Sequence, residues 1–392
     1  MSVHERTGPG DLDRAMGVVE RLASGIGGRR PTSSEEAEAA RLLAAELESD
    51  GVHARVEEFD GYATFAAPFA LILGVAIAPA LLAVRRRLAR VILAMAAVAG
   101  LASEGSLLAA PVSSALSRRR SGNVVATIEP VRAPERTLCL MAHMDTSRSG
   151  LIFHPRVVFL MTRWIAANSL MVIAAAALEP FAARSPLARR LAAGIRLALA
   201  AGLGLLAERE LRGVDVPGAN DNASGCGVVV ALAARLAAAP LESTRVVVLI
   251  TGCEESGTLG ARAFRDAHDT DGWMFLNFDN VGGPGSVRFL RREGVIAKWD
   301  ADPGMIAAAT GVGERRLDLR MAPEDSPAGL TYDSSPIHAA GGRALTISVQ
   351  DGSIPNLHWP TDVVENVDLD GVARTLEAGA ELVAAIERGE AD

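Results

Sequence analysis

The chain has 392 residues, enough for one large domain or two of ordinary size. Its formal net charge of -8 and its pI near 5.5 argue against a general nucleic-acid binder, so we expect no nucleic-acid partner. Hydrophobic residues make up 49% of the chain and the mean hydropathy is +0.22, which is high for a soluble enzyme. The three cysteines suggest no disulfide framework, which favours a reducing compartment.

The first sixty residues have the pattern of a soluble domain. Residues 11–24 and 34–50 have the periodicity of amphipathic helices, and residues 52–59 alternate like an edge strand. No apolar run in residues 1–27 could serve as a secretory signal.

Two strongly apolar insertions follow. In the first, residues 63–84 are uncharged and long enough to cross a bilayer, and residues 91–110 are apolar apart from Glu104. In the second, residues 157–178 and 191–207 are each interrupted by a single arginine. One interpretation is a pair of membrane-associated helical hairpins in contact with a lipid bilayer. The other is a cap of buried helices or a homo-oligomer interface. We favour the membrane, mainly because of residues 63–84.

The rest of the chain alternates strands with helices, which predicts an α/β sandwich with a mixed, mostly parallel central sheet. Strands are expected at residues 123–128, 137–142, 245–251, 273–278 and 344–349, and helices at 222–236, 258–267 and 369–387. If strands 52–59, 123–128 and 137–142 form an antiparallel meander, both insertions leave from the same end of the sheet. The apolar hairpins should then flank the mouth of a site at that end.

Acidic and imidazole side chains gather where the predicted strands end. They are His143 with Asp145, Asp221 in a glycine-framed turn, Glu254 with Glu255, Asp279 and His358. Each has an ordinary explanation on its own: Asp221 suits a helix N-cap, the glutamates an acidic helix start, and a single histidine is most often a loop residue. Together, oxygen and nitrogen donors without thiolates suit a pair of catalytic zinc ions.

The ordered motifs closely resemble those of peptidase family twenty-eight, the zinc aminopeptidases of the bacterial leucyl aminopeptidase type. The motifs are His-x-Asp at His143, Gly-x-x-Asp-Asn-x-Ser-Gly at Gly218, Glu-Glu-x-Gly-x-x-Gly at Glu254, Asn-x-Asp at Asn277 and His-x-x-x-Asp at His358. The resemblance covers about residues 12–60, 121–150 and 213–388. It implies a three-layer sandwich and a discontinuous zinc peptidase domain of residues 1–60, 121–150 and 213–392, interrupted by hairpins at 61–120 and 151–212.

The resemblance also implies a role for each site residue. His143 and Asp279 would bind one zinc ion, Glu255 and His358 a second, and Asp221 would bridge both. Glu254 would be the general base, taking a proton from the attacking water and passing it to the leaving amine. Asp145 would orient His143 through its carboxylate, and Asp362 would support the loop that bears His358.

The sequence departs from the family pattern at two places. A long apolar insertion lies between His143 and Asp221, where family members have a short loop. Ser334 stands where the family commonly has a histidine, so details of substrate binding should not be transferred.

Three functions therefore compete. The first is a membrane-associated zinc aminopeptidase acting on peptides; the second is a glutaminyl-cyclase-like acyltransferase, which uses one zinc; the third is a non-catalytic binding protein. The intact ligand set favours the first. The arginine-rich hairpin tips would place the peptidase segments outside under the positive-inside rule, but no export signal precedes them, so we expect the cytoplasmic side. Hydrophobic peptides delivered by the membrane are the expected substrates if the hairpins flank the mouth.

Overall fold

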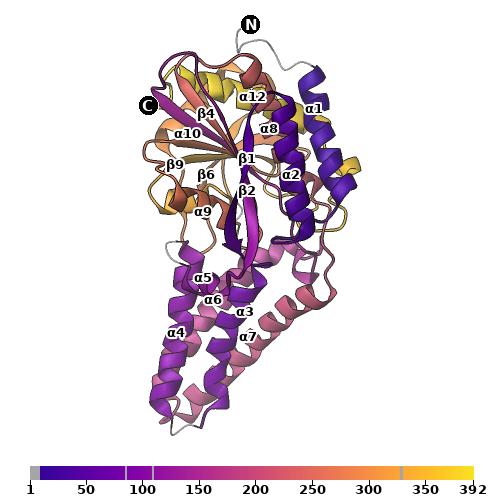
Figure 1. Ribbon diagram of the computed structural model, residues 1–392. Coiled ribbons are helices and arrows are strands. Elements are labelled where there is room, and N and C mark those ends of the chain that lie inside the picture. The colour runs from indigo at the N-terminus through magenta and orange to yellow at the C-terminus, as the bar shows by residue number, and fades with distance from the viewer. Residues whose placement is uncertain (1–8, 84–85, 108–109, 327–329) are drawn as a thin grey trace.

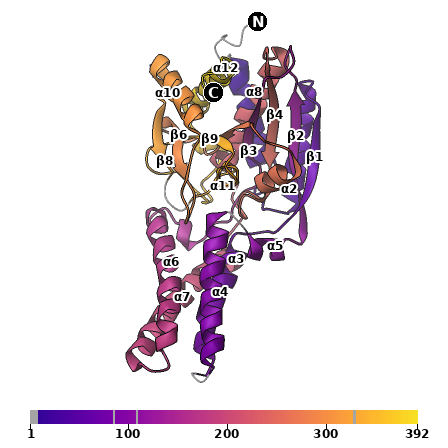
Figure 2. The same ribbon diagram turned by 90° about the vertical axis from the view of Figure 1, so that its left-hand side faces the viewer.

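The computed structural model describes residues 9–83, 86–107, 110–326 and 330–392. A twisted sheet with helices on both faces forms the upper part of the molecule, and a bundle of apolar helices projects from one end of it (Figures 1 and 2). The predicted three-layer α/β sandwich with inserted hydrophobic helices is therefore confirmed. The division into one discontinuous domain and two hairpin units stays a prediction.

The sheet of the described chain has nine strands, in the order β1-β2-β4-β3-β5-β9-β6-β7, with β8 paired to β6. Their bounds are β1 Ala54–Gly61, β2 Arg119–Ile128, β3 Arg136–His143, β4 Thr244–Thr251, β5 Met274–Phe278, β6 Ser286–Glu293, β7 Trp299–Asp300, β8 Ala322–Asp325 and β9 Arg343–Gln350. The four strands β4, β3, β5 and β9 run parallel, and antiparallel strands flank them. The carboxyl ends of the parallel strands thus meet at one edge.

The predicted meander of the first three strands is wrong. Strand β1 does pair antiparallel with β2, but β4 lies between β2 and β3. The sequence could not reveal this, because β4 comes more than a hundred residues after β3 and enters the sheet between them. Since β2 is antiparallel to β4 and β3 is parallel to it, β2 and β3 still run in opposite directions. Both insertions therefore leave the sheet at the same end, as expected.

Alternate residues of the central strands face two different helix layers. Leu138 and Leu140 of β3 join the core under one layer, whereas Cys139 and Met141 join the core under the other. The first layer contains α1 Pro9–Glu20, α2 Ser34–Ser49, α8 Ser224–Ala238, α10 Pro303–Arg315 and α12 Leu369–Glu387, with α1 extended by a wide turn over Arg21–Ile26. The second contains α9 Leu259–Ala267 and α11 Ser335–Ala339. The strands and helices after residue 285, other than β9 and α12, were not predicted.

The bundle consists of four long helices and one short one. They are α3 Ala66–Ile77, α4 Arg87–Ser106, α6 Met161–Leu178 and α7 Pro186–Arg212, with α5 Pro111–Leu116 beside the sheet. Each long helix packs against two others, α3 on α4, α4 on α6, α6 on α7 and α7 on α3. Short 3-10 turns at Ala78–Leu81, Leu151–Phe153, Val158–Leu160 and Glu179–Phe181 lie at its ends.

The apolar run at residues 63–84, on which the membrane interpretation mainly rested, is not one long helix. Helix α3 ends at Ile77, and a 3-10 turn containing Pro79 follows it, because proline cannot donate the next helical hydrogen bond. Residues 84 and 85, where the run ends, lie outside the described residues. Three other segments are long and apolar enough to span a membrane: Arg87–Ser106, Val158–Phe181 and Pro186–Arg212.

A buried ion cluster joins three bundle helices near the far end. Glu179 accepts hydrogen bonds from Arg90 of α4, at 2.5 Å, and from Arg196 of α7. All three side chains are at least nine-tenths buried. Because buried charges are tolerated only when paired, the cluster fixes the register of these helices.

A single buried arginine, Arg29, ties together two loops of the sandwich. Its guanidinium donates to the carbonyl oxygens of Leu22, Gly27, Met144, Pro217 and Gly218, at 2.7–3.1 Å. Burial lowers the pKa of Arg29 only to about 10, so the group stays charged at neutral pH. It therefore holds the loop after β3 against the loop before α8.

Replacing Arg29 by methionine should lower the free energy of unfolding by about 3–5 kcal/mol, because buried carbonyl oxygens lose a charged donor. Denaturant unfolding of the purified protein measures the change. Arg21→Met is the matched control: Arg21 lies eight positions earlier, is 45% exposed and makes only a surface ion pair with Glu46. Its effect should stay within about 1 kcal/mol. Equal effects of the two substitutions would contradict the role given to Arg29.

Candidate metal centre

Every predicted site residue lies at the carboxyl edge of the parallel strands. His143 is the last residue of β3, Glu254 and Glu255 follow β4, and Asp279 follows β5. Asp221 lies in the turn before α8, and the loop after β9 carries His358. Side chains far apart in the sequence meet here because parallel strands end at a common edge.

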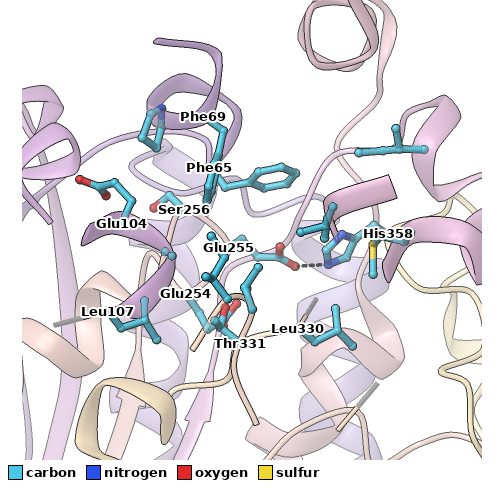
Figure 3. Close-up of a pocket in the computed structure, with 18 of the residues that line it drawn as sticks. Phe65, Phe69, Glu104, Leu107, Glu254, Glu255, Ser256, Leu330, Thr331 and His358 are labelled. Carbon is cyan, nitrogen blue, oxygen red and sulfur yellow. Dashed lines mark ion pairs between the residues drawn. The ribbon is translucent and has the colours of Figure 1, made fainter. Parts of the chain in front are cut away.

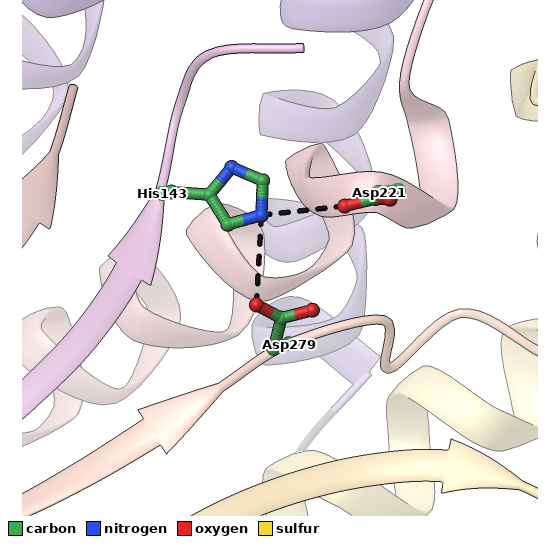
Figure 4. Close-up of side chains that lie close together, drawn as sticks. All are labelled: His143, Asp221 and Asp279. Carbon is green, nitrogen blue, oxygen red and sulfur yellow. Dashed lines mark ion pairs between the residues drawn. The ribbon is translucent and has the colours of Figure 1, made fainter. Parts of the chain in front are cut away.

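Five of these side chains form two groups that share one carboxylate. In the first group, His143 Nε2 lies 3.3 Å from Asp221 Oδ1 and 3.5 Å from Asp279 Oδ2 (Figure 4). In the second, His358 Nε2 lies 3.3 Å from Asp221 Oδ2 and 3.0 Å from Glu255 Oε1. The donor atoms within each group lie within 4.8 Å of one another. Asp221 thus offers one oxygen to each group.

The tautomer of His143 follows from its neighbours. Its Nδ1 lies 3.1 Å from the backbone oxygen of Asp145, which can only accept, so Nδ1 carries the proton. The lone pair of Nε2 then points at two carboxylates, an arrangement that repels unless a cation lies between them.

The Asp145 carboxylate has a different role from the predicted one. It does not hydrogen-bond His143: its nearer oxygen is 3.7 Å from Nδ1, and the backbone oxygen makes that contact instead. The carboxylate accepts the backbone N–H groups of Glu254 and Glu255 at 3.0 and 2.9 Å. Asp145 therefore aligns the end of β3 with the pair of glutamates after β4.

The turn that carries Asp221 requires its framing glycines. Gly218 has φ +62°, and a Cβ there would lie 2.3 Å from Thr146 Cγ2; a Cβ on Gly225 would lie 2.3 Å from the backbone oxygen of Phe278. Asn222 completes the turn by donating to that same oxygen. The glycines and Asn222 thus allow the turn that carries Asp221 to pack directly against the end of β5.

Two carboxylates outside the ligand groups hold the backbone of the site. Asp362 accepts the N–H groups of Asn220 and Asp221 at 2.7 and 3.0 Å, which supports the bridging position rather than the His358 loop alone. Glu36 of α2 accepts the N–H of Cys253 at 2.8 Å, just before Glu254. Glu36 lies in the predicted helix of residues 34–50 and belongs to none of the site motifs, so its role at the site was not predicted.

The site contains more carboxyl groups than basic groups. Burial raises the pKa of Asp279 to about 8 and that of Glu254 well above its usual value. Burial would also raise the pKa of Asp221, but interactions with the imidazoles of His143 and His358 keep it below its usual range. The two imidazoles therefore cannot neutralise all of these carboxylates when they are ionised, whereas bound cations would.

The residues fit a pair of zinc ions. Each group supplies one imidazole nitrogen and two carboxylate oxygens, which are donors that catalytic zinc takes. Glu255 Oε1 is buried and receives no hydrogen bond, as expected of a ligand oxygen.

One large cavity contains both ligand groups and Glu254, and its wall continues into the bundle. Phe65 and Phe69 of the first insertion lie over Glu254, Glu255 and His358 (Figure 3). Ser334, the departure from the family pattern, lies away from the ligands: it is buried and donates to Glu293 at 2.6 Å. The insertions thus form part of the wall of the site, as predicted from their common end.

Comparisons with solved structures agree on the fold. A zinc aminopeptidase from Bacillus subtilis is 14% identical with a TM-score of 0.57, covering 96% of this chain and 95% of that one. An aminopeptidase from Aneurinibacillus sp. strain AM-1 is 15% identical with a TM-score of 0.58, covering 97% and 95%. A glutaminyl cyclase from Tannerella forsythia is 14% identical with a TM-score of 0.54, covering 95% and 97%.

No curated protein matches the sequence significantly. The sequence profile of Peptidase family M28 matches residues 206–383, the part that carries Asp221, Glu254, Glu255, Asp279 and His358. Residues 206–383 thus carry the sequence signature of peptidase family M28, on a fold that the chain shares with zinc aminopeptidases.

Proposed function

We propose that the chain is a zinc-dependent aminopeptidase with a co-catalytic pair of ions. His143 and Asp279 would hold one ion, Glu255 and His358 would hold the other, and Asp221 would contribute one oxygen to each. The observation that carries the proposal is the division of the Asp221 carboxylate, with one oxygen facing each histidine at 3.3 Å. A single-ion site would leave one complete group of three ligands without a purpose.

Glu254 is the general base of the proposed reaction. Among the described residues its carboxylate is in neither ligand group, yet it lines the same cavity, and its backbone is fixed by Asp145. When bound, the ions would polarise the scissile carbonyl and lower the pKa of water. Glu254 takes the proton of the attacking water and delivers it to the leaving amine.

The competing functions on this fold predict different site compositions. A glutaminyl-cyclase-like acyltransferase needs one ion, and a binding protein needs neither the second group nor a buried free carboxylate. Two complete groups beside Glu254 support hydrolysis over both.

We also propose that the bundle associates with a lipid bilayer. Of the 22 large hydrophobic residues that are exposed in the described chain, 16 lie in the two insertions. Within Val158–Phe181, only 11% of the most apolar 18-residue stretch is buried inside the protein. An apolar surface of this size is normally shielded from water, and the acyl chains of a bilayer would shield helices that are long and apolar enough to span it.

All strands then lie on one side of the bilayer, because both insertions return to the end they left. We place that side in the cytoplasm. Exposed arginines at the hairpin tips (Arg86, Arg87, Arg184, Arg189 and Arg190) would favour the opposite side under the positive-inside rule. Protease resistance of the sheet domain in intact cells, lost when the cells are opened, supports the cytoplasmic side; digestion in intact cells contradicts it.

The purified protein should contain two zinc ions per chain and release the N-terminal residue of unblocked peptides. Glu254→Gln should retain both ions and lose at least a hundredfold in kcat, since the base is removed and the ligands remain. Glu255→Gln, the neighbouring change, should lose zinc as well. Metal analysis and peptide hydrolysis of the three proteins measure this.

Retained turnover in Glu254→Gln would remove Glu254 from the base role. One zinc ion per chain with cyclisation of N-terminal glutamine, and no hydrolysis, would favour the acyltransferase. Zinc without either reaction would favour a binding protein.

Asp362→Ala should weaken zinc binding about 10- to 100-fold, because the backbone that presents Asp221 loses both acceptors. Competition with a chelator of known affinity measures the change. The control is Glu365→Ala, an exposed carboxylate three residues later, which should bind zinc like the parent. Unchanged affinity in Asp362→Ala would show that the bridging position is held by other contacts.

The protein should float with liposomes, and the double variant Leu170→Asp/Ile173→Asp should float less, because each aspartate costs about 2.5–3.5 kcal/mol in the hydrocarbon. Both residues are exposed on α6, at 66% and 49%. The control, Val131→Asp/Leu317→Asp, alters residues of the sheet domain that are 65% and 80% exposed and should float like the parent. Equal flotation of both double variants would contradict insertion of α6.

A further inference from the structure

The cavity that holds the ligand groups does not end at them. Its wall continues between the bundle helices, along α3 as far as Leu73, along α6 as far as Val172, and to Leu206 of α7. The cavity has a volume of about 210 Å³ and opens to solvent at its mouth. We call the part between the bundle helices the bundle chamber.

The bundle chamber is deep. Phe65 and Leu73 both line it and are eight residues apart on or beside α3, and Met161 and Val172 line it eleven residues apart on α6. At 1.5 Å per helical residue these separations are about 12 and 16 Å. That depth is about half the ~30 Å hydrocarbon core of a bilayer, which is the length of one leaflet's acyl chains.

The chamber is also apolar. Its bundle wall includes Phe65, Phe69, Leu73, Trp164, Val172 and Leu206. Glu104, a charged group in the same wall, is already occupied: it accepts hydrogen bonds from the backbone N–H groups of Val112 and Ser113 at 2.7 and 3.1 Å, and from the Ser113 hydroxyl. Asn168 Oδ1 is a buried acceptor in this wall that has no hydrogen-bond partner, but most of the bundle wall is apolar, so a ligand there would be largely apolar.

An aromatic contact links the chamber directly to the ligand groups. The Phe153 ring packs edge-on against His358 at 4.4 Å between centroids, and against Phe65 at 6.3 Å. Arg209 lies 4.3 Å over the Phe65 ring and donates to Ser147, which fixes this wall to the loop after β3. A group bound in the chamber would therefore lie next to the candidate ligand groups, where the scissile bond would be placed.

The chemistry of an exopeptidase assigns the chamber to one side of that bond. The peptide beyond the scissile bond must leave through the open mouth, whereas the first residue needs only a closed pocket. We propose, on the basis of the proposed aminopeptidase function, that the bundle chamber binds a long apolar chain carried by the N-terminal residue of the substrate. The substrate class is thus peptides whose first residue bears a long alkyl or lipid-like group. The apolar outer face of the bundle places this chamber within reach of chains in the bilayer.

The test is a series of Xaa-Gly dipeptides whose first residue has a straight alkyl side chain of increasing length, from about four to twelve carbons, with leucine as reference. The value of kcat/KM should rise about fourfold for each added methylene until the chamber is full. Val172→Phe, which narrows the deep end, should lower the ratio of long-chain to leucyl kcat/KM at least tenfold. Leu73→Phe narrows the chamber from α3 and serves if Val172→Phe does not fold.

Leu170→Phe is the matched control, because Leu170 is on the same helix and 66% exposed; its ratio should equal that of the parent. If the leucyl substrate is hydrolysed but kcat/KM does not rise along the series, the proposal for the chamber is wrong and the proposed aminopeptidase function is unaffected. A rise that both narrowing variants leave intact would also overturn the proposal for the chamber. Failure to hydrolyse any member, leucine included, would instead count against the proposed function.

Discussion

A cluster of carboxyl groups that is buried at the carboxyl edge of the sheet, and that outnumbers the basic groups beside it, is the constraint on which the rest of this structure depends. Asp145, Asp221, Glu254, Glu255 and Asp279 are each more than nine-tenths buried. Carboxylates at such depth are stable only when donors or cations surround them. The ends of three strands, the turn before α8 and the loop after β9 all supply parts of that surrounding.

The support comes mostly from backbone groups rather than from a matching set of basic side chains. Asp145 and Asp362 accept pairs of N–H groups next to Glu254 and Asp221, and Arg29 binds the carbonyl oxygens of the loops between them. Rigid backbone can hold side chains in place before any ion arrives. A stable fold and a candidate cation site are therefore compatible here.

Four of the five candidate ligands were recognisable in the sequence because each lies at or just after a buried strand or in a glycine-framed turn, whereas His358, in the loop after β9, was recognised from its motif. The supporting contacts could not be predicted, since they join residues remote in the chain: Arg29 binds Met144 and Pro217, 115 and 188 positions away. The order of the central strands was misjudged for the same reason. The length of α3 was misjudged because composition alone hides the effect of Pro79.

The way in which the two insertions join the sheet has a consequence for the lengths that they can have. Gly61 pairs with Arg119 across β1 and β2, and Ser149 donates to Val214 across the second junction. Each insertion therefore begins and ends at neighbouring backbone positions, where longer connections cost little because closure entropy grows only with the logarithm of length. Each insertion can therefore change in length without altering the strand pairing of the sheet.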